Sequence, residues 1–174
     1  NRIQDPIQLE IFNEITMQYD SVIFLETGLF KFFKRHKELV DKFTTPKVIS
    51  VNTDIDYRNK VILADSLLLI GLDNYLGPNH KFYDGIPEYI KEDFTIPGIF
   101  SDVAEKYAYA NIPRIEFYTF LDKIIYHGKV LYYKDFTLDI EDRYKIGYSK
   151  LKMKWAKENE YFVNKYDDYS KLDW

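Results

Sequence analysis

Three histidines are the side chains of this 174-residue sequence best suited to metal binding or proton transfer. His36, His80 and His127 are far apart in the chain, and no two of them are separated by one helical turn. A zinc site needs three or four converging ligands, and no local stretch supplies two. The chain also has no cysteine. We therefore predict that His36 lies on a helix face, His80 in a loop, and His127 on the inner side of a helix.

The segment Asn52-x-Asp54-x-Asp56 resembles the beginning of a calcium-binding loop. Such a loop continues with a glycine and ends with a bidentate glutamate. Tyr57 stands at the glycine position and Leu63 at the glutamate position. We therefore predict that these polar side chains cap a turn after a strand.

Helical signals surround this turn. Asp5-Pro6 has the form of a helix N-cap followed by proline, and Ile7, Ile11 and Ile15 then form one apolar stripe. Phe30, Phe33, Lys37 and Val40 are also at helical spacing, in a segment with several basic residues. The further predicted helices are Ser21 to Phe43, Pro87 to Phe94, Gly98 to Ala110, Phe117 to Tyr133 and Ser149 to Tyr166. The predicted inner stripe of the helix from Phe117 to Tyr133 consists of Phe117, Phe120, Leu121, Ile124, Gly128 and Leu131.

Three apolar runs of strand length lie between the second and third helices. They are Lys47 to Thr53, Val61 to Leu63 and Leu67 to Leu72. We expect a small sheet of about three to four strands, built from meanders and covered by helices. The sequence thus predicts a mostly helical α+β fold, with residues 1–174 forming a single domain because no repeat or linker divides them.

Composition excludes several classes of function. The net charge is -4, which argues against a nucleic-acid-binding protein. No apolar run approaches the roughly 20 residues that span a bilayer. Glycine-rich phosphate loops and nucleophile elbows are absent from the sequence.

Several separated motifs resemble one known family. The chain is similar to the gliding-motility lipoprotein family GldB of Bacteroidota over about two-thirds of its length. The motifs are Asp54-Ile55-Asp56-Tyr57, Ala64-Asp65-Ser66-Leu67-Leu68-Leu69-Ile70, Leu72-Asp73-Asn74-Tyr75-Leu76-Gly77, Phe120-Leu121-Asp122-Lys123-Ile124-Ile125-Tyr126, Gly128-Lys129-Val130-Leu131-Tyr132 and Lys145-Ile146-Gly147-Tyr148.

The resemblance implies a lipid-anchored envelope protein at the outer membrane, facing the periplasm. It would serve gliding motility and the associated type IX secretion machinery by binding other proteins. Such proteins carry an N-terminal lipidated cysteine, so we expect the chain to be a fragment of a longer protein.

The family also resembles zincin-type zinc proteases, which bind metal through a helical H-E-x-x-H motif and a third ligand on a later helix. On that template Ala104, Glu105 and Ala108 occupy the motif, and His127 occupies the third-ligand position. The resemblance therefore implies a zincin-like fold without metal, cofactor or catalysis. Glu105 is equally compatible with an ordinary exposed helix residue.

The leading hypothesis is a non-catalytic protein that binds partners through a degenerate protease-like cleft. Its candidate interaction surface is the Gly- and Pro-rich loop that holds Asp73, Asn74, Tyr75, Phe82 and Tyr83. Core packing is the alternative role of these aromatic residues. An active metal-dependent hydrolase or peptidase, and a glycan- or small-ligand-binding module, are the alternative functions.

Overall fold

The computed structural model describes residues 5–113 and 120–138, and the architecture is α+β with a small mixed sheet. Its α-helices are α1 (Pro6–Gln18), α2 (Ile23–Leu39), α3 (Glu88–Lys91), α4 (Ile96–Asn111) and α5 (Phe120–Thr137). The strands are β1 (Lys47–Val51), β2 (Val61–Ala64) and β3 (Leu67–Gly71), followed by short 3-10 helices η2 (Leu72–Asn74) and η3 (Lys81–Tyr83). The predicted helix over Ser149 to Tyr166 lies outside the described residues.

The sheet has the strand order β1-β3-β2. β3 pairs parallel with β1, with Lys47 opposite Leu67, and antiparallel with β2, with Val61 opposite Ile70. The expected meander is therefore wrong for the first connection. β3 takes the central place because its leucine-rich sequence buries more apolar surface there than at an edge, and Leu68 and Ile70 are fully buried.

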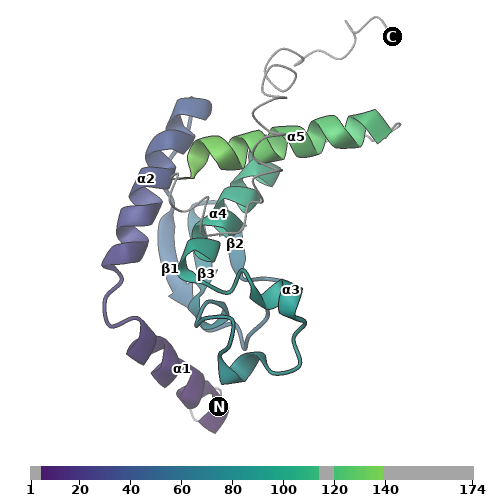
Figure 1. The fold of residues 1–174 in the computed structure, drawn as a ribbon. Coiled ribbons are helices and arrows are strands. Elements are labelled where there is room, and N and C mark those ends of the chain that lie inside the picture. Colours follow the sequence, from purple (N-terminus) through teal and green to yellow (C-terminus); the bar gives the residue numbers. More distant parts are fainter. Residues whose placement is uncertain (1–4, 114–119, 139–174) are drawn as a thin grey trace, which may run out of the picture.

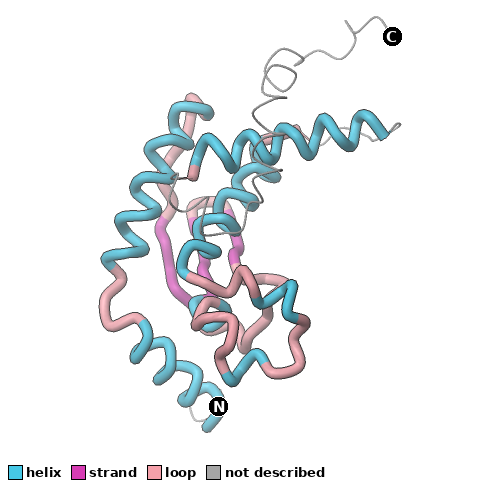
Figure 2. The backbone as a smooth tube through the Cα atoms, viewed as in Figure 1, coloured by secondary structure: helices cyan, strands magenta, loops and turns pink. Residues whose placement is uncertain are grey.

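Helices cover this sheet and each other (Figure 1; Figure 2). α4 packs on the sheet at β2 and also contacts α2 and α5. α5 crosses the ends of α2 and α4, while α1 lies against η2 at the opposite end of the molecule. The helix that carries Glu105 thus packs on both the sheet and the helix that carries His127.

Local sequence explains the helix ends. The Asp5 side chain accepts a hydrogen bond from the Ile7 amide (2.9 Å), as the predicted N-cap requires. Thr95 caps α4 in the same way through the Gly98 amide (3.3 Å), so α4 begins slightly before the predicted start.

The buried helix faces differ from the expected ones. In α1, Ile11 is buried but Ile7 is 63% exposed. In α2, Phe30 is 71% exposed. The buried residues of α2 are instead Leu25, Leu29, Phe32, Phe33 and His36.

The buried face of α5 differs in part from the predicted stripe. Gly128 is buried as predicted, but Ile124 and Leu131 are only half-buried. Phe117 and the side chains of Phe120 and Leu121 lie outside the described part of the structure. The most enclosed side chains of this helix are Tyr126, Val130, Tyr133, Lys134 and Thr137. Helical periodicity identifies a possible stripe, but the position of α2 and α4 decides which stripe is covered.

Candidate functional site

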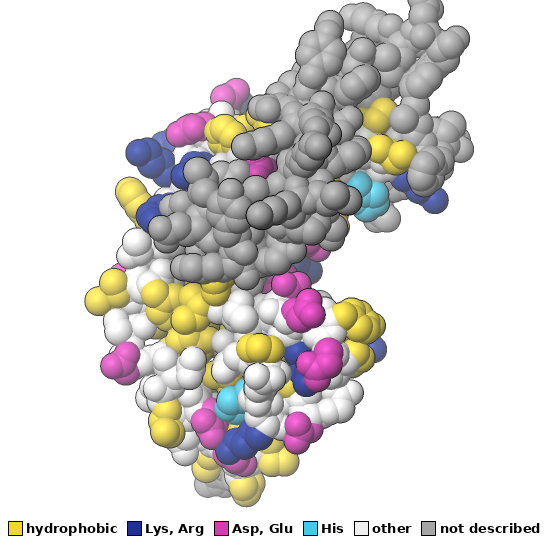
Figure 3. All heavy atoms as spheres, viewed as in Figure 1, with side chains coloured by type: hydrophobic (Ala, Val, Ile, Leu, Met, Phe, Trp, Pro, Cys, Tyr) yellow, Lys and Arg dark blue, Asp and Glu magenta, His cyan; other side chains and the backbone are white. Residues whose placement is uncertain are grey.

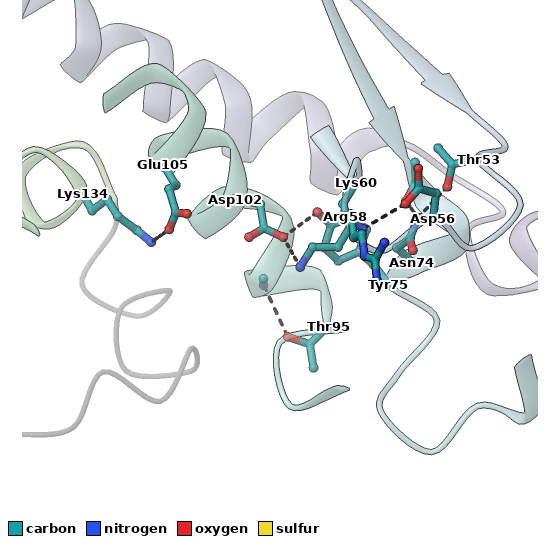
Figure 4. Close-up of polar contacts among 12 residues, drawn as sticks. Thr53, Asp56, Arg58, Lys60, Asn74, Tyr75, Thr95, Asp102, Glu105 and Lys134 are labelled. Atoms are coloured by element: carbon teal, nitrogen blue, oxygen red, sulfur yellow. Dashed lines mark hydrogen bonds and ion pairs between the residues drawn. The ribbon is translucent and has the colours of Figure 1, made fainter. Parts of the chain in front are cut away.

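The degenerate protease positions on α4 form part of the protein's packing. Ala104 and Ala108 are fully buried, one turn apart. Glu105 lies beside them and is partly exposed, and its Oε2 atom is 2.8 Å from Nζ of Lys134 on α5. Figure 4 shows this ion pair bridging the two helices. Glu105 therefore has a cationic partner, while the two alanines present only methyl groups.

His127 does not face the interior, contrary to the sequence prediction. Its side chain is exposed. The preceding residue, Tyr126, is buried and stacks on Tyr109 of α4 with ring centroids 6.4 Å apart. The helix is rotated so that Tyr126, and not His127, makes the contact with α4.

The loop proposed as an interaction surface is largely internal. Asp73, Asn74, Tyr75 and Tyr83 are each at most 1% exposed, so the prediction that they form an exposed surface is wrong. Only Phe82 among the five reaches solvent, as a half-buried side chain. The alternative role of core packing therefore holds for Tyr75 and Tyr83.

Tyrosine hydroxyls explain why this loop can be buried. The Tyr83 hydroxyl donates to the Asp73 carbonyl (2.6 Å) and accepts from the Leu76 amide (2.9 Å). The Tyr19 hydroxyl donates to the Tyr75 carbonyl (2.6 Å). These bonds satisfy backbone groups that would otherwise be buried without partners.

The Asp73 carboxylate holds the loop that follows β1. It accepts hydrogen bonds from the Ile55 amide (2.7 Å), the Thr53 amide (3.1 Å) and the Thr53 hydroxyl (2.9 Å). Asp54 and Ile55 have φ angles of 60° and 58°, a conformation that is costly for a β-branched residue. Burial raises the pKa of Asp73, and these hydrogen bonds oppose that shift.

The neighbouring Asn74 side chain completes this cluster. Its Nδ2 atom donates to the Thr53 hydroxyl (2.7 Å), while its Oδ1 atom is buried without a hydrogen-bond partner. The turn itself is capped as predicted. The Asn52 side chain accepts from the Asp54 amide, and Asp56 accepts from the Arg58 amide, both at 3.1 Å.

A second polar cluster joins β2, the buried loop and α4 (Figure 4). Nζ of Lys60 is 2.6 Å from Oδ2 of Asp102, which also accepts a hydrogen bond from the Tyr75 hydroxyl (2.8 Å). The ammonium lies 5.5 Å from the Tyr75 ring centroid and 5.2 Å from that of Phe94. Burial raises the pKa of Tyr75, so this hydroxyl remains a donor at neutral pH. Sequence reasoning missed this cluster because Lys60, Tyr75 and Asp102 are separated by 15 and 27 residues.

The other two histidines also have structural neighbours. His36 is buried and hydrogen-bonds Tyr133 through Nδ1. Burial lowers the pKa of His36 to about 4. Nε2 of His80 lies 3.6 Å from a carboxylate oxygen of Glu14 on α1. The described part of the chain contains no group of three or more His, Asp or Glu side chains arranged to hold a metal.

One pocket of about 360 Å³ opens beside α2, in contact with α5. Its chemistry is mostly cationic, and Phe136 supplies an apolar wall. The lining residues are Lys31, Lys34, Arg35, Glu38 and Phe136.

Comparisons with known proteins identify one family. The family described as gliding motility protein GldB matches residues 1–166. No curated protein and no solved structure matches the chain. Among the described helices, none combines the length and apolar character needed to cross a membrane.

Proposed function

The chain belongs to the gliding motility protein GldB family, and from this premise we propose that it is a non-catalytic protein acting through partner binding. The family is one of lipoproteins with a role in gliding motility, which supports a lipid-anchored protein of the cell envelope. The proposal further places it at the outer membrane, facing the periplasm, where it supports type IX secretion.

The surroundings of Glu105 carry the non-catalytic part of this proposal. A zincin needs two imidazoles beside the catalytic glutamate, and Ala104 and Ala108 are buried methyl groups at those positions. The Lys134 ammonium, 2.8 Å from the Glu105 carboxylate, gives that carboxylate a structural partner. The exposed His127 adds one separate nitrogen ligand.

The proposed partner surface lies beside the buried loop of residues 73–83, on α1 and η3. Lys81 bonds Glu10 of α1 (2.7 Å) and Glu14 (2.8 Å), so α1 lies against η3. Phe12 on α1 is 60% exposed, and Phe82 is half-buried on η3. Exposed aromatic side chains of this kind commonly dominate binding energy at protein interfaces.

The degenerate protease-like cleft at α4 and α5 is a separate part of the hypothesis, because α1 lies at the opposite end of the molecule. It is supported by the packing of α4 against both the sheet and α5, the arrangement that the zincin resemblance implies. The cleft would act as a docking groove for a protein segment, without hydrolysing it.

Site-specific photo-crosslinking in cells that carry the lipidated protein tests the partner hypothesis. A crosslinker at Phe12 should give a discrete product with another envelope protein, and Tyr89, which is 75% exposed, is the matched control position. Phe12→Ala should weaken the partner about 30-fold or more, as at an interface hot spot, and should impair motility and secretion. Absence of a crosslink from position 12, or normal motility and secretion in a folded Phe12→Ala protein, would reject this surface.

Metal analysis of the purified chain separates this proposal from the hydrolase alternative. One equivalent of bound zinc, with a peptidase activity that chelation removes, would favour the enzyme. Glu105→Gln is the corresponding variant: the non-catalytic proposal expects motility to persist, whereas a zinc peptidase would be inactivated.

A further inference from the structure

The exposed face of α2 changes from apolar to basic along its length. Ile23 and Phe30 are 68% and 71% exposed. Thr27 lies between them, and Lys34 and Lys37 continue the same stripe at helical spacing. One helix face therefore offers aromatic and aliphatic side chains followed by two ammonium groups.

The pocket described above lies beside the basic half of this face. Lys31, Lys34 and Arg35 line it together with Glu38, and Phe136 of α5 closes one side. The Arg35 guanidinium also hydrogen-bonds the Leu138 carbonyl, which fixes its position. A concave site with more basic than acidic side chains suits an anionic group such as a phosphate.

The charge of α2 is opposite to that of the whole chain. The complete sequence has a net charge of -4. The α2 helix contains four basic and two acidic side chains, so its net charge is +2 with His36 neutral. Figure 3 shows dark blue basic side chains beside yellow hydrophobic ones in this part of the surface. Because α2 is positive while the whole chain is negative, an anionic surface should be attracted to α2 more than to the rest of the protein.

Exposed hydrophobic residues are concentrated in the first two helices, and Ile23, Phe30 and Leu39 are the ones on α2. Among the described residues, eight of the twelve exposed large hydrophobic side chains fall between positions 7 and 39. They are Ile7, Leu9, Phe12, Met17, Val22, Ile23, Phe30 and Leu39. The α2 face, which combines Ile23 and Phe30 with lysines, has the composition that is typical of helices lying in a membrane interface.

We propose that the outer face of α2 docks on an anionic phospholipid surface. Phe30 and Ile23 enter the boundary between headgroups and acyl chains, and Lys34 and Lys37 bind lipid phosphates, one of which occupies the pocket. This inference rests on the lipid-anchored placement in the proposed function. An anchor fixes one point of a protein, whereas a second contact at α2 would also fix the orientation of its body.

Vesicle flotation with the unlipidated 174-residue chain tests this contact by itself. The protein should bind phosphatidylcholine vesicles that contain phosphatidylglycerol, bind pure phosphatidylcholine far more weakly, and dissociate as salt is raised. Lys34→Glu combined with Lys37→Glu should reduce binding by more than about 30-fold, because each lost basic residue contributes about fivefold and each new carboxylate is repelled by the anionic surface. Phe30→Ser should reduce it several-fold.

Matched variants distinguish a local contact from an effect of overall charge. Lys106→Glu combined with Lys123→Glu makes the same charge change at exposed positions on α4 and α5. Tyr89→Ser removes an equally exposed aromatic ring from another part of the surface. Both controls should retain most of the binding, and circular dichroism should confirm folding of every variant.

Several results would overturn the inference. They are absence of vesicle binding, equal binding to neutral vesicles, or an equal loss in the Lys106/Lys123 control. Titration of inorganic phosphate, followed by the amide signals of α2, identifies the alternative source of the anion: saturation by free phosphate without vesicle binding would reassign the pocket. Failure of the Phe12 crosslink would reject the partner surface only, since vesicle binding is measured on the isolated chain.

Discussion

The imidazole of His36 on α2 is hydrogen-bonded through Nδ1 to the hydroxyl of Tyr133 on α5. Around this pair, Phe32, Phe43 and Tyr107 place their rings within 6 Å of the imidazole centroid. The histidine thus lies at the meeting point of three helices, where a charged imidazolium would be poorly solvated.

The first prediction concerns acid stability. The folded pKa of His36 is about 4, against 6.5 in an unfolded chain, so the unfolded state binds the proton more readily. The neutral His36 imidazole therefore contributes about 3 kcal/mol to the free energy of unfolding. This contribution is complete above pH 6.5 and is lost as the pH falls from 6.5 towards 4. Urea unfolding at a series of pH values measures it.

Variants assign this loss to His36. His36→Gln should lower stability at neutral pH and flatten the pH dependence between 6.5 and 4. The exposed His127 is the control position, and His127→Gln should leave the slope unchanged. A slope that survives in His36→Gln would show that another group controls acid unfolding.

The second prediction concerns the contact between α2 and α4. A Cβ atom at Gly28 would lie 2.2 Å from the Phe100 ring. Gly28→Ala should therefore destabilise the protein by about 1–3 kcal/mol through overpacking, although alanine is the better helix former by about 1 kcal/mol. Thermal unfolding measures the change, with exposed Thr27→Ala as the neutral control.

Relief of the clash provides the internal test of that contact. Phe100→Leu shortens the ring side chain, so it should cost less in the Gly28→Ala background than in the natural sequence. Strict additivity of the two substitutions would show that these residues do not share a contact in solution.

The third prediction concerns the Asp73 carboxylate. Asp73→Asn replaces one acceptor oxygen by a donor, although both oxygens accept hydrogen bonds from residues 53–55. We expect a loss of about 2–4 kcal/mol and faster hydrogen exchange at the Ile55 amide. Asp65→Asn, in the exposed turn between β2 and β3, should change neither measurement appreciably.

The fourth prediction concerns the Lys60–Asp102 ion pair. Asp102→Ala leaves the Lys60 ammonium, a largely buried group, without this carboxylate and removes the acceptor of the Tyr75 hydroxyl. Stability should fall by about 2–4 kcal/mol. The Lys91–Glu88 ion pair serves as the comparison, because the Glu88 side chain is 80% exposed. Glu88→Ala should lower the free energy of unfolding by about 0.5 kcal/mol or less. Equal costs in chemical denaturation would contradict this assignment.

Local signals in the sequence determined the order and approximate bounds of the elements. Asp5-Pro6 specified the start of α1, and the apolar runs at 47–53, 61–63 and 67–72 specified three strands. The α+β class and the family also followed from the sequence. These features depend on neighbouring residues, caps and alternation, so they are readable without knowledge of distant contacts.

Tertiary structure decided which side chains are buried and which polar groups meet. Phe30 and Phe32 have similar chemistry, yet only Phe32 faces α4. Asp73 and Tyr75 are in a segment whose composition is typical of an exposed loop, but hydrogen bonds to residues 53–55 and Asp102 enclose them. Burial is a property of packed surfaces, and a helical or loop pattern alone does not fix which neighbour covers which face.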